Sequence, residues 1–312
     1  MSRTVTVINA KSSKMKSLAC IILLTFLFGC ASAKSAETPL MPGSADFSAE
    51  NVHAPWERSP GFTAARRLVF IGLDGWGGAY VSKAKMPTVK RMMAGGSWTL
   101  KARCIMPSYS LPNWTALFSG TPPEKRNSAN FPTIFTLVRE SGPGNKPAFF
   151  YEWDSLRNIC TDEEAEKINI ASDRESALKI ASYIEENKPV FTAVVFNQPD
   201  EVGFWGGKEY YAKLAEMDSY ISIIEEAVRN AGIYDDTVFV LSADHGGVLF
   251  GHGFNTPRQR KIPLVIFGRG IKGNYEIRPR SSIIDIAPTM AAILGLQASP
   301  EWTGKILTEV FK

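Results

Sequence analysis

Two of the three histidines in this 312-residue chain lie close together and beside a carboxylate. Asp244 and His245 follow directly on an apolar run at residues 237–243, and His252 comes soon afterwards between two glycines. Carboxylate oxygen and neutral imidazole nitrogen are ligands that suit zinc and similar divalent metals. A polar turn with a capping aspartate and two surface histidines would contain the same residues, so the spacing alone leaves both interpretations open.

Two further aspartates follow apolar runs. Asp74 comes directly after residues 67–73, and Asp200 comes soon after residues 189–196. Either residue alone is ordinarily a turn or helix cap. Ligands of open α/β sheets bind beyond the carboxyl ends of the strands, however, so several such residues together indicate a metal site at one edge of a sheet. Two divalent ions there would activate an attacking oxygen and neutralise a phosphate.

A serine stands at the expected start of a helix. Pro112 suits the first turn of a helix, which places Ser110 at or just before the helix N-cap. This end of a helix offers free backbone N–H groups and a positive dipole, which together favour phosphate binding. On its own the serine is explained by a capping role, but beside a metal site it becomes a candidate nucleophile.

The rest of the chain predicts the elements that would position these residues. Apolar, β-rich runs alternate with segments of helical periodicity, which favours an α/β sandwich around a largely parallel sheet. Strands are expected at residues 67–73, 147–151, 189–196, 237–243 and 262–268. Helices are expected at residues 86–96, 112–120, 131–140, 173–187, 208–231 and 283–294.

The first residues predict export. Three lysines precede an apolar run at residues 18–29, and that run is too short for a comfortable transmembrane helix. It ends in Leu27-Phe28-Gly29-Cys30, which resembles a bacterial lipoprotein signal and makes Cys30 the expected lipid-attachment residue. An ordinary cleavage site at Ala31-Ser32-Ala33 and a start at Met15 stay open as alternatives.

We therefore expect a lipoprotein-type signal peptide at residues 1–29, a flexible tether at residues 30–62 and a folded domain at residues 63–312. The protein would lie in the bacterial cell envelope, in the periplasm or at the outer membrane, and meet the membrane through its lipid anchor. Loss of the four basic residues of the signal lowers the formal charge of +4 to about zero, which leaves no basic excess for nucleic acid. Cys104 and Cys160 would remain, either as a disulfide or as two buried thiols.

Together, these residues resemble the alkaline phosphatase superfamily, and within it the type I phosphodiesterase/nucleotide pyrophosphatase family. The matching motifs recur in the order of that family through nearly the whole expected domain. They are Leu73-Asp74-Gly75, Pro107-Ser108-Tyr109-Ser110-Leu111-Pro112-Asn113-Trp114, Pro199-Asp200, Ser242-Ala243-Asp244-His245-Gly246-Gly247, Gly251-His252-Gly253 before Ile262-Pro263, and Asp285-Ile286-Ala287-Pro288-Thr289. The resemblance implies a three-layer α/β/α sandwich at residues 63–312 that acts as a metal-dependent phosphoric ester hydrolase with two zinc ions.

The resemblance also implies a role for each residue. Ser110 matches the nucleophile, which contacts metal and forms a phospho-enzyme intermediate, and Asn113 matches a residue that hydrogen-bonds a phosphate oxygen. The ligands of the metal that activates the nucleophile are matched by Asp74, Asp244 and His245. Ligands of the second metal are matched by Asp200 and His252. The implied substrate is a small-molecule phosphate ester, and the motifs leave mono- and diesters and the oligomeric state open.

One position departs from the family pattern. In the family, two residues separate the aspartate of the second metal from a Gly-His pair. This chain reads Asp200-Glu201-Val202-Gly203-Phe204. Phe204 replaces a zinc ligand and leaves the second metal with fewer protein ligands than zinc usually has. Glu201, Asn197 or water would have to complete that site.

Two other functions stay open. The change at Phe204 favours a degenerate, non-catalytic lipoprotein that binds a ligand in the old pocket, whereas the retained Ser110 and metal ligands favour an enzyme. A sulfatase-like hydrolase is disfavoured, because Trp114 stands at the arginine position of the sulfatase motif Cys/Ser-x-Pro-x-Arg. Aromatic residues beside the motifs are expected to be mostly core. They are Trp76, Tyr109, Trp114, Phe204 and Trp205.

Overall fold

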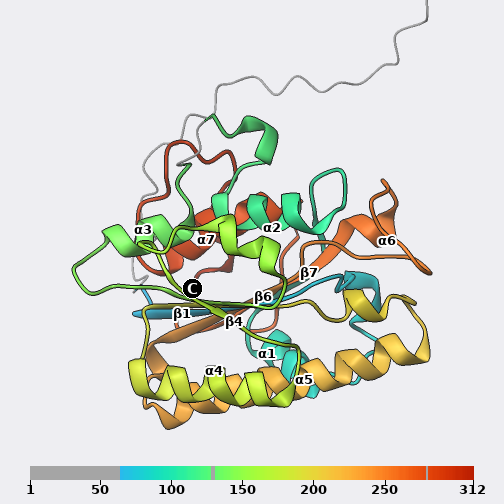
Figure 1. Ribbon diagram of the computed structural model, residues 1–312, viewed down its shortest axis with the longest axis horizontal. Coiled ribbons are helices and arrows are strands. Elements are labelled where there is room, and N and C mark those ends of the chain that lie inside the picture. Colours follow the sequence, from blue (N-terminus) through green and yellow to red (C-terminus); the bar gives the residue numbers. More distant parts are fainter. Residues whose placement is uncertain (1–63, 128–130, 279) are drawn as a thin grey trace, which may run out of the picture. The chain divides into compact units, whose positions relative to one another are not determined.

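The computed structural model describes residues 64–127, 131–278 and 280–312 (Figure 1). The expected signal peptide, the lipid-attachment residue Cys30 and the tether lie outside the described residues. Within the described ranges, none of the helices combines the length and the apolar character needed to cross a membrane.

These residues form one eight-stranded sheet in the order β4-β3-β5-β1-β6-β7-β2-β8. The strands are β1 (Arg67–Leu73), β2 (Ser97–Arg103), β3 (Ala148–Tyr151), β4 (Glu166–Asn169), β5 (Phe191–Phe196), β6 (Thr237–Ser242), β7 (Lys261–Gly268) and β8 (Tyr275–Glu276). Five strands from β4 to β6 run parallel, β7 is antiparallel to both β6 and β2, and β8 is parallel to β2. The prediction of a largely parallel sheet is therefore confirmed.

The central strands are apolar along their whole length because both of their faces are covered. Every residue of β5 and β6 is buried, as is every residue of β1 after the first. Such continuous Val, Ile, Leu and Phe runs are typical of parallel strands between two helix layers. β1 lies between β5 and β6, with Leu73 opposite Phe196 and Gly72 opposite Ser242. Since all three strands run in one direction, the residues that follow them leave the sheet on the same side, where the carboxyl ends of these strands lie.

Helices cover both faces of the sheet (Figure 1). On one face, α1 (Pro87–Gly95), α4 (Arg174–Asn187) and α5 (Lys208–Asn230) pack together. On the other face lie α2 (Ser110–Ser119), α3 (Ile134–Glu140) and α7 (Ile286–Ile293). A short helix, α6 (Pro257–Arg260), leads directly into β7. The expected three-layer α/β/α sandwich is thus confirmed.

The sequence patterns do not predict β2, β4 and β8. β4 and β8 are the two edges of the sheet, and β2 lies next to β8. The four residues of β4 are exposed or only half-buried, and β2 alternates between buried and more exposed positions. Strands near an edge lack the continuous apolar run that identifies a central strand, so their pattern is weak.

The two cysteines are separate free thiols, and both are buried. This finding decides between the disulfide and the unpaired thiols. Burial raises the pKa of Cys104 and of Cys160 to about 12. Both thiols are therefore protonated at neutral pH and behave as small apolar groups of the core.

Candidate metal and nucleophile site

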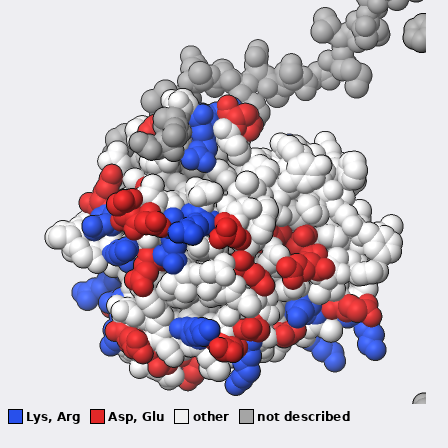
Figure 2. All heavy atoms as spheres, viewed as in Figure 1, with Lys and Arg blue, Asp and Glu red and all other residues white. Residues whose placement is uncertain are grey.

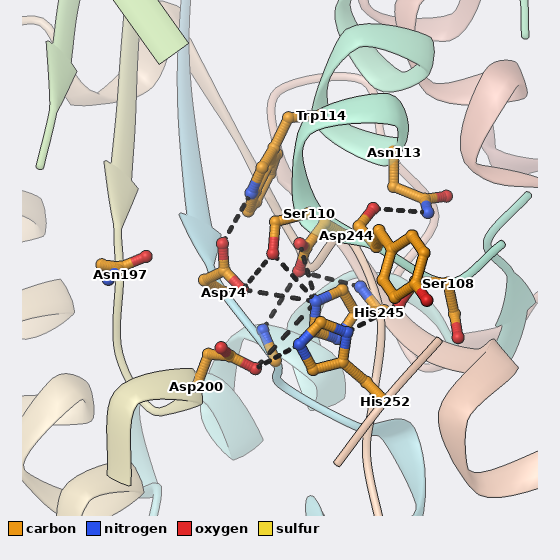
Figure 3. Close-up of polar contacts among 12 residues, drawn as sticks. Asp74, Ser108, Ser110, Asn113, Trp114, Asn197, Asp200, Asp244, His245 and His252 are labelled. Atoms are coloured by element: carbon orange, nitrogen blue, oxygen red, sulfur yellow. Dashed lines mark hydrogen bonds and ion pairs between the residues drawn. The ribbon is translucent and has the colours of Figure 1, made fainter. Parts of the chain in front are cut away.

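The three adjacent strand ends bring the predicted aspartates together (Figure 3). Asp74 follows β1, Asp244 follows β6, and Asp200 follows the turn after β5. The backbone ties these ends to one another, since the Asp200 N–H donates to the Asp74 carbonyl at 3.0 Å and the Gly75 N–H donates to Asp244 Oδ1 at 3.0 Å. Asp74 and Asp244 are buried, whereas the Asp200 side chain keeps partial access to solvent.

Ser110 points into this group of carboxylates from the first turn of α2. Tyr109, not Ser110, is the N-cap residue, and no side chain caps the helix. The Ser110 hydroxyl donates to Asp74 Oδ1 at 3.2 Å and lies 3.0 Å from His245 Nε2. The hydroxyl is therefore free of the capping role that would otherwise explain a serine at this position.

The two histidines present the same ring nitrogen to the carboxylates. His245 Nδ1 lies 3.0 Å from the Gly246 carbonyl, and His252 Nδ1 lies 2.9 Å from the Ser108 carbonyl. Because a carbonyl can only accept, both Nδ1 atoms carry the proton and both Nε2 atoms keep a lone pair. The rings stack with centroids 4.0 Å apart. Backbone carbonyls that hold Nδ1–H in this way are the usual support for metal-binding histidines.

Two groups of side chains have the donor atoms that a metal ion needs. One comprises Asp74, Asp244 and His245, and the other comprises Asp200, His245 and His252. Asp244 Oδ2 and Asp200 Oδ1 are buried without a hydrogen-bond partner among the described residues. Asp244 Oδ2 instead faces the lone pair of His245 Nε2 at 3.2 Å. Buried lone pairs that face one another are unfavourable unless a cation lies between them, so the residues fit a divalent metal.

Burial and mutual repulsion oppose charge in the metal-free site. Burial raises the pKa of Asp74 well above its usual range, and the neighbouring charges of Asp244 and Asp200 raise it further. Burial likewise raises the pKa of Asp200, and it raises that of Asp244 to about 6. Burial, followed by the charge of His252, lowers the pKa of His245 to about 4. Such clustered, shifted groups are typical of functional sites.

Asn113 has a different environment from the one expected. Its side chain is fully buried, and its Nδ2 donates to the carbonyls of Pro107 at 3.1 Å and Tyr109 at 2.9 Å. Its Oδ1 accepts from the Ile105 N–H at 2.8 Å. Both amide hydrogens are thus used within the loop before α2. In this structure Asn113 fixes the loop that delivers Ser110, and no hydrogen remains for the expected contact with a phosphate oxygen.

Trp114 is a site residue that the sequence patterns assign only to the core or to a stacking role. Its indole N–H donates to Asp74 Oδ2 at 3.0 Å, while Ser110 occupies Oδ1 of the same carboxylate. Gly72 makes room for the ring, because a Cβ at that position would lie 2.4 Å from Trp114 Cη2. The signal that points to this contact is the spacing, since a residue four positions after Ser110 lies on the same face of the helix.

Phe204 takes no part in either group of candidate ligands. Its side chain is 52% exposed, and its ring packs edge-on against Phe250 with centroids 4.9 Å apart. The possible substitutes for the missing histidine pair with each other, since Asn197 Nδ2 donates to Glu201 Oε1 at 2.7 Å. The remaining donor of the second group is His245, whose Nε2 lies 4.0 Å from Asp200 Oδ1 and which the first group also uses.

Two family models match complementary parts of the chain. The model for type I phosphodiesterase/nucleotide pyrophosphatase matches residues 68–127, which include Asp74 and Ser110. The sulfatase model matches residues 125–296, more than half of the chain, and this part holds the other candidate ligands. The segment with the serine is therefore phosphodiesterase-like, and the rest of the site is sulfatase-like.

Curated relatives match over limited regions. Arylsulfatase K of Bos taurus is 31% identical over 112 residues, which cover 33% of this chain and 21% of the relative. Phosphopentomutase of Alkaliphilus oremlandii is 31% identical over 139 residues, which cover 43% of this chain and 33% of the relative. The chain thus spans a fifth to a third of the length of these relatives.

Solved structures show the same fold at low sequence identity. The murine ectonucleotide pyrophosphatase/phosphodiesterase 5, as an inactive variant in complex with AMP, superimposes with a TM-score of 0.68 and 10% identity over 79% of this chain and 100% of its own. A 2-O GAG sulfatase superimposes with a TM-score of 0.67 and 15% identity over 78% of this chain and 73% of its own.

Proposed function

This chain belongs to the sulfatase family within the alkaline phosphatase superfamily, and from that premise we propose that it is a metal-dependent hydrolase of phosphoric esters with Ser110 as its nucleophile. The observation that carries the proposal is the position of the Ser110 hydroxyl. It caps no helix, it donates to Asp74, and it lies in the group of carboxylates in which Asp244 Oδ2 and Asp200 Oδ1 have no hydrogen-bond partner within the described ranges.

The residues divide the chemistry among them. Asp74 Oδ1 orients the Ser110 hydroxyl and accepts its proton as Ser110 Oγ attacks the phosphorus atom and the ester P–O bond breaks. The leaving group departs as an alcohol after it takes up a proton, which Asp74 can return. Water afterwards cleaves the phosphoserine and releases phosphate or a monoester. The first turn of the ten-residue helix α2 would offer the N–H groups of Ser110 and Leu111 to the phosphoryl oxygens, since Pro112 has none and that of Asn113 donates to the Tyr109 carbonyl.

Zinc is the metal that the donor set suits best, since it consists of carboxylate oxygens and imidazole nitrogens. Asp74, Asp244 and His245 would hold one ion, and Asp200 and His252 would contribute to the second. When bound, these ions would neutralise negative charge on the attacking and leaving oxygens.

A sulfate ester is the second candidate substrate, because the sulfatase model matches the larger part of the chain. The nucleophile segment argues for phosphate. Ser110 lies in the part that the phosphodiesterase model matches, and Trp114 occupies the arginine position of the sulfatase motif and bonds to Asp74.

The test is hydrolysis of bis-p-nitrophenyl phosphate, p-nitrophenyl phosphate and p-nitrophenyl sulfate by protein that has been stripped of metal and reloaded with Zn²⁺. We expect a phosphate ester to be cleaved, and Ser110→Ala to lower the rate by a factor of about 10³ or more. Ser119→Ala, at the other end of α2, is the matched control and should keep the activity. Cleavage of the sulfate alone would favour the second candidate. Zinc binding without turnover of any ester would favour the non-catalytic ligand-binding lipoprotein.

We also propose that the protein is exported and anchored in the bacterial cell envelope through Cys30. The support is the basic and apolar N-terminal sequence that ends at this cysteine. Cell fractionation tests the proposal. The protein should sediment with membranes, and Cys30→Ser should move it to the soluble envelope fraction. Equal membrane association of both forms would contradict the anchor.

A further inference from the structure

Five large apolar side chains are exposed beside the candidate site, and we call them the apolar rim. Their exposed fractions run from 50% to 75%. They are Tyr109, Phe204, Leu249, Phe250 and Phe254. A group of large exposed apolar side chains is uncommon on soluble proteins and usually marks a place of contact.

The rim is continuous with the residues that would do the chemistry. Tyr109 directly precedes Ser110, and its ring lies 5.9 Å from the ring of His252. Phe250 and Phe254 flank His252 in the sequence, two residues away on either side. Phe204 packs against Phe250 and joins the segment after Asp200 to the segment around His252. A group bound at Ser110 therefore has this apolar surface next to it.

Two residues of the rim adopt a costly backbone conformation. Phe204 has φ 48° and Leu249 has φ 51°, in the left-handed region that bulky residues avoid. The Trp205 N–H donates to the Leu249 carbonyl at 3.1 Å, which ties the two segments together. Backbone strain of this kind is concentrated at functional sites, where the conformation serves function although it costs stability.

The hairpin turn that carries Leu249 also holds bulky residues where small or polar residues are usual. Val248 and Gly251 exchange backbone hydrogen bonds of 3.0 Å, so Leu249 and Phe250 form a two-residue turn. Such turns favour Asn and Gly, which accept left-handed backbone at little cost. Here the turn places a leucine 71% exposed and a phenylalanine 75% exposed at its tip. Apart from the contact of Phe250 with Phe204, these two side chains remain largely in water.

The rim also has no acidic or basic residue among its members. On the face shown in Figure 2 the surface over the loops beside α6 is mostly uncharged, whereas Lys, Arg, Asp and Glu mix over α4 and α5. The charged residues Glu201 and Arg258, close to the rim in the sequence, are exposed as well. A ligand for this surface should therefore be apolar where it meets the rim and anionic only where it meets the candidate metal site.

We propose that the apolar rim binds the alkyl chain of an amphiphilic ester, so that the substrate class is a phosphate ester with an extended apolar group. The inference rests on the proposed function, since the ester group has to lie at Ser110. The binding free energy would become more favourable with each methylene group of the chain that the rim removes from water.

Alkylphosphonic acids from methyl to octyl test the proposal, because they carry the anion and the chain and cannot be hydrolysed. Their Kd values are measured by calorimetry on the full-length, Zn²⁺-loaded protein, on Phe250→Ser and Phe254→Ser, and on Leu178→Ser as a matched control. Leu178 lies on α4 and is 46% exposed. We expect Kd to fall about twofold per methylene, roughly half the gain of a fully buried methylene because the rim is open on one side. The dependence should weaken in both rim variants and persist in the control.

Several results would overturn the inference. A Kd that is independent of chain length, or a chain-length dependence that survives both rim substitutions, would remove the alkyl subsite and leave the proposed function intact. A loss of self-association in Phe250→Ser, with unchanged phosphonate binding, would assign the rim to a second copy of the chain. If methylphosphonic acid does not bind and no ester is cleaved, the proposed function fails together with the inference.

Discussion

Asp244→Asn should stabilise the metal-free protein and destabilise the metal-loaded one. Asp244 is fully buried, and its Oδ1 accepts from the N–H groups of Gly75 at 3.0 Å and His245 at 2.8 Å. An asparagine Oδ1 keeps both bonds. Its Nδ2 would take the place of Oδ2, which has no hydrogen-bond partner in the part of the chain that the structure describes and lies 3.2 Å from His245 Nε2. The amide can donate to that lone pair, so a repulsive contact becomes a hydrogen bond.

The magnitude follows from the pKa of Asp244. Burial raises this pKa from 3.8 to about 6. A shift of about two units at about 1.4 kcal/mol per unit corresponds to roughly 3 kcal/mol. A raised carboxyl pKa means that ionisation opposes folding. The penalty is absent below pH 4, grows between pH 4 and 6, and is fully present at pH 7. For a domain of this size roughly 3 kcal/mol corresponds to a Tm difference of about 6–12 °C.

Thermal unfolding at pH 7 and at pH 4, with chelator and with Zn²⁺, measures all of these effects. With chelator at pH 7 the variant should unfold at the higher temperature, and at pH 4 the two proteins should converge. With Zn²⁺ only the wild type should gain strongly, because the variant has lost a ligand. A metal-free variant that is less stable than the wild type at pH 7 would refute the argument that the site is arranged for a missing cation.

Three further predictions concern other parts of the structure. Trp114→Phe removes the hydrogen bond to Asp74 and should lower zinc affinity and kcat/KM about 10- to 100-fold. The KM for phosphate esters should change little. An unchanged zinc affinity would show that the contact between Trp114 and Asp74 is only packing. Leu249→Asn places a residue that tolerates left-handed backbone at this position and should raise the free energy of unfolding by about 1 kcal/mol in urea titration. The same substitution should weaken the binding of octylphosphonic acid. A lower free energy of unfolding would argue against backbone strain at Leu249. Cys104 and Cys160 should stay unreactive towards Ellman's reagent at pH 8 and should both react in denaturant, because burial holds each pKa at about 12.

The central strands and the residues at their ends are predictable because the signal is local. A continuous apolar run identifies a buried strand, and the polar residue that ends it identifies a candidate ligand. Parallel pairing then places Asp74, Asp200 and Asp244 at one edge of the sheet without further information. The edge strands escape prediction because β4 and β8 are short and partly exposed, and their identity depends on their neighbours.

The partners of each side chain could not be predicted, because they depend on contacts between distant segments. Asn113 and Trp114 are adjacent in one motif, yet the first turns to the loop before α2 and the second to Asp74. The helical positions differ by about 100°, so one residue faces the loop and the other faces β1. A motif records which residue types occur together, and the helix decides which of them reach the site.

Phe204 shows what a missing ligand changes and what it leaves in place. His245 Nε2 faces Asp244 and Asp200, but one lone pair binds one ion, so only one of the two groups can be complete at a time. We therefore expect the wild type to retain one zinc ion per chain after dialysis, measured by plasma emission spectrometry. Phe204→His should raise the content towards two, since histidine tolerates the left-handed backbone at this position. Two tightly held ions in the wild type would show that Asp200 and His252 suffice without a further protein ligand, and the histidine that Phe204 replaces would then be dispensable.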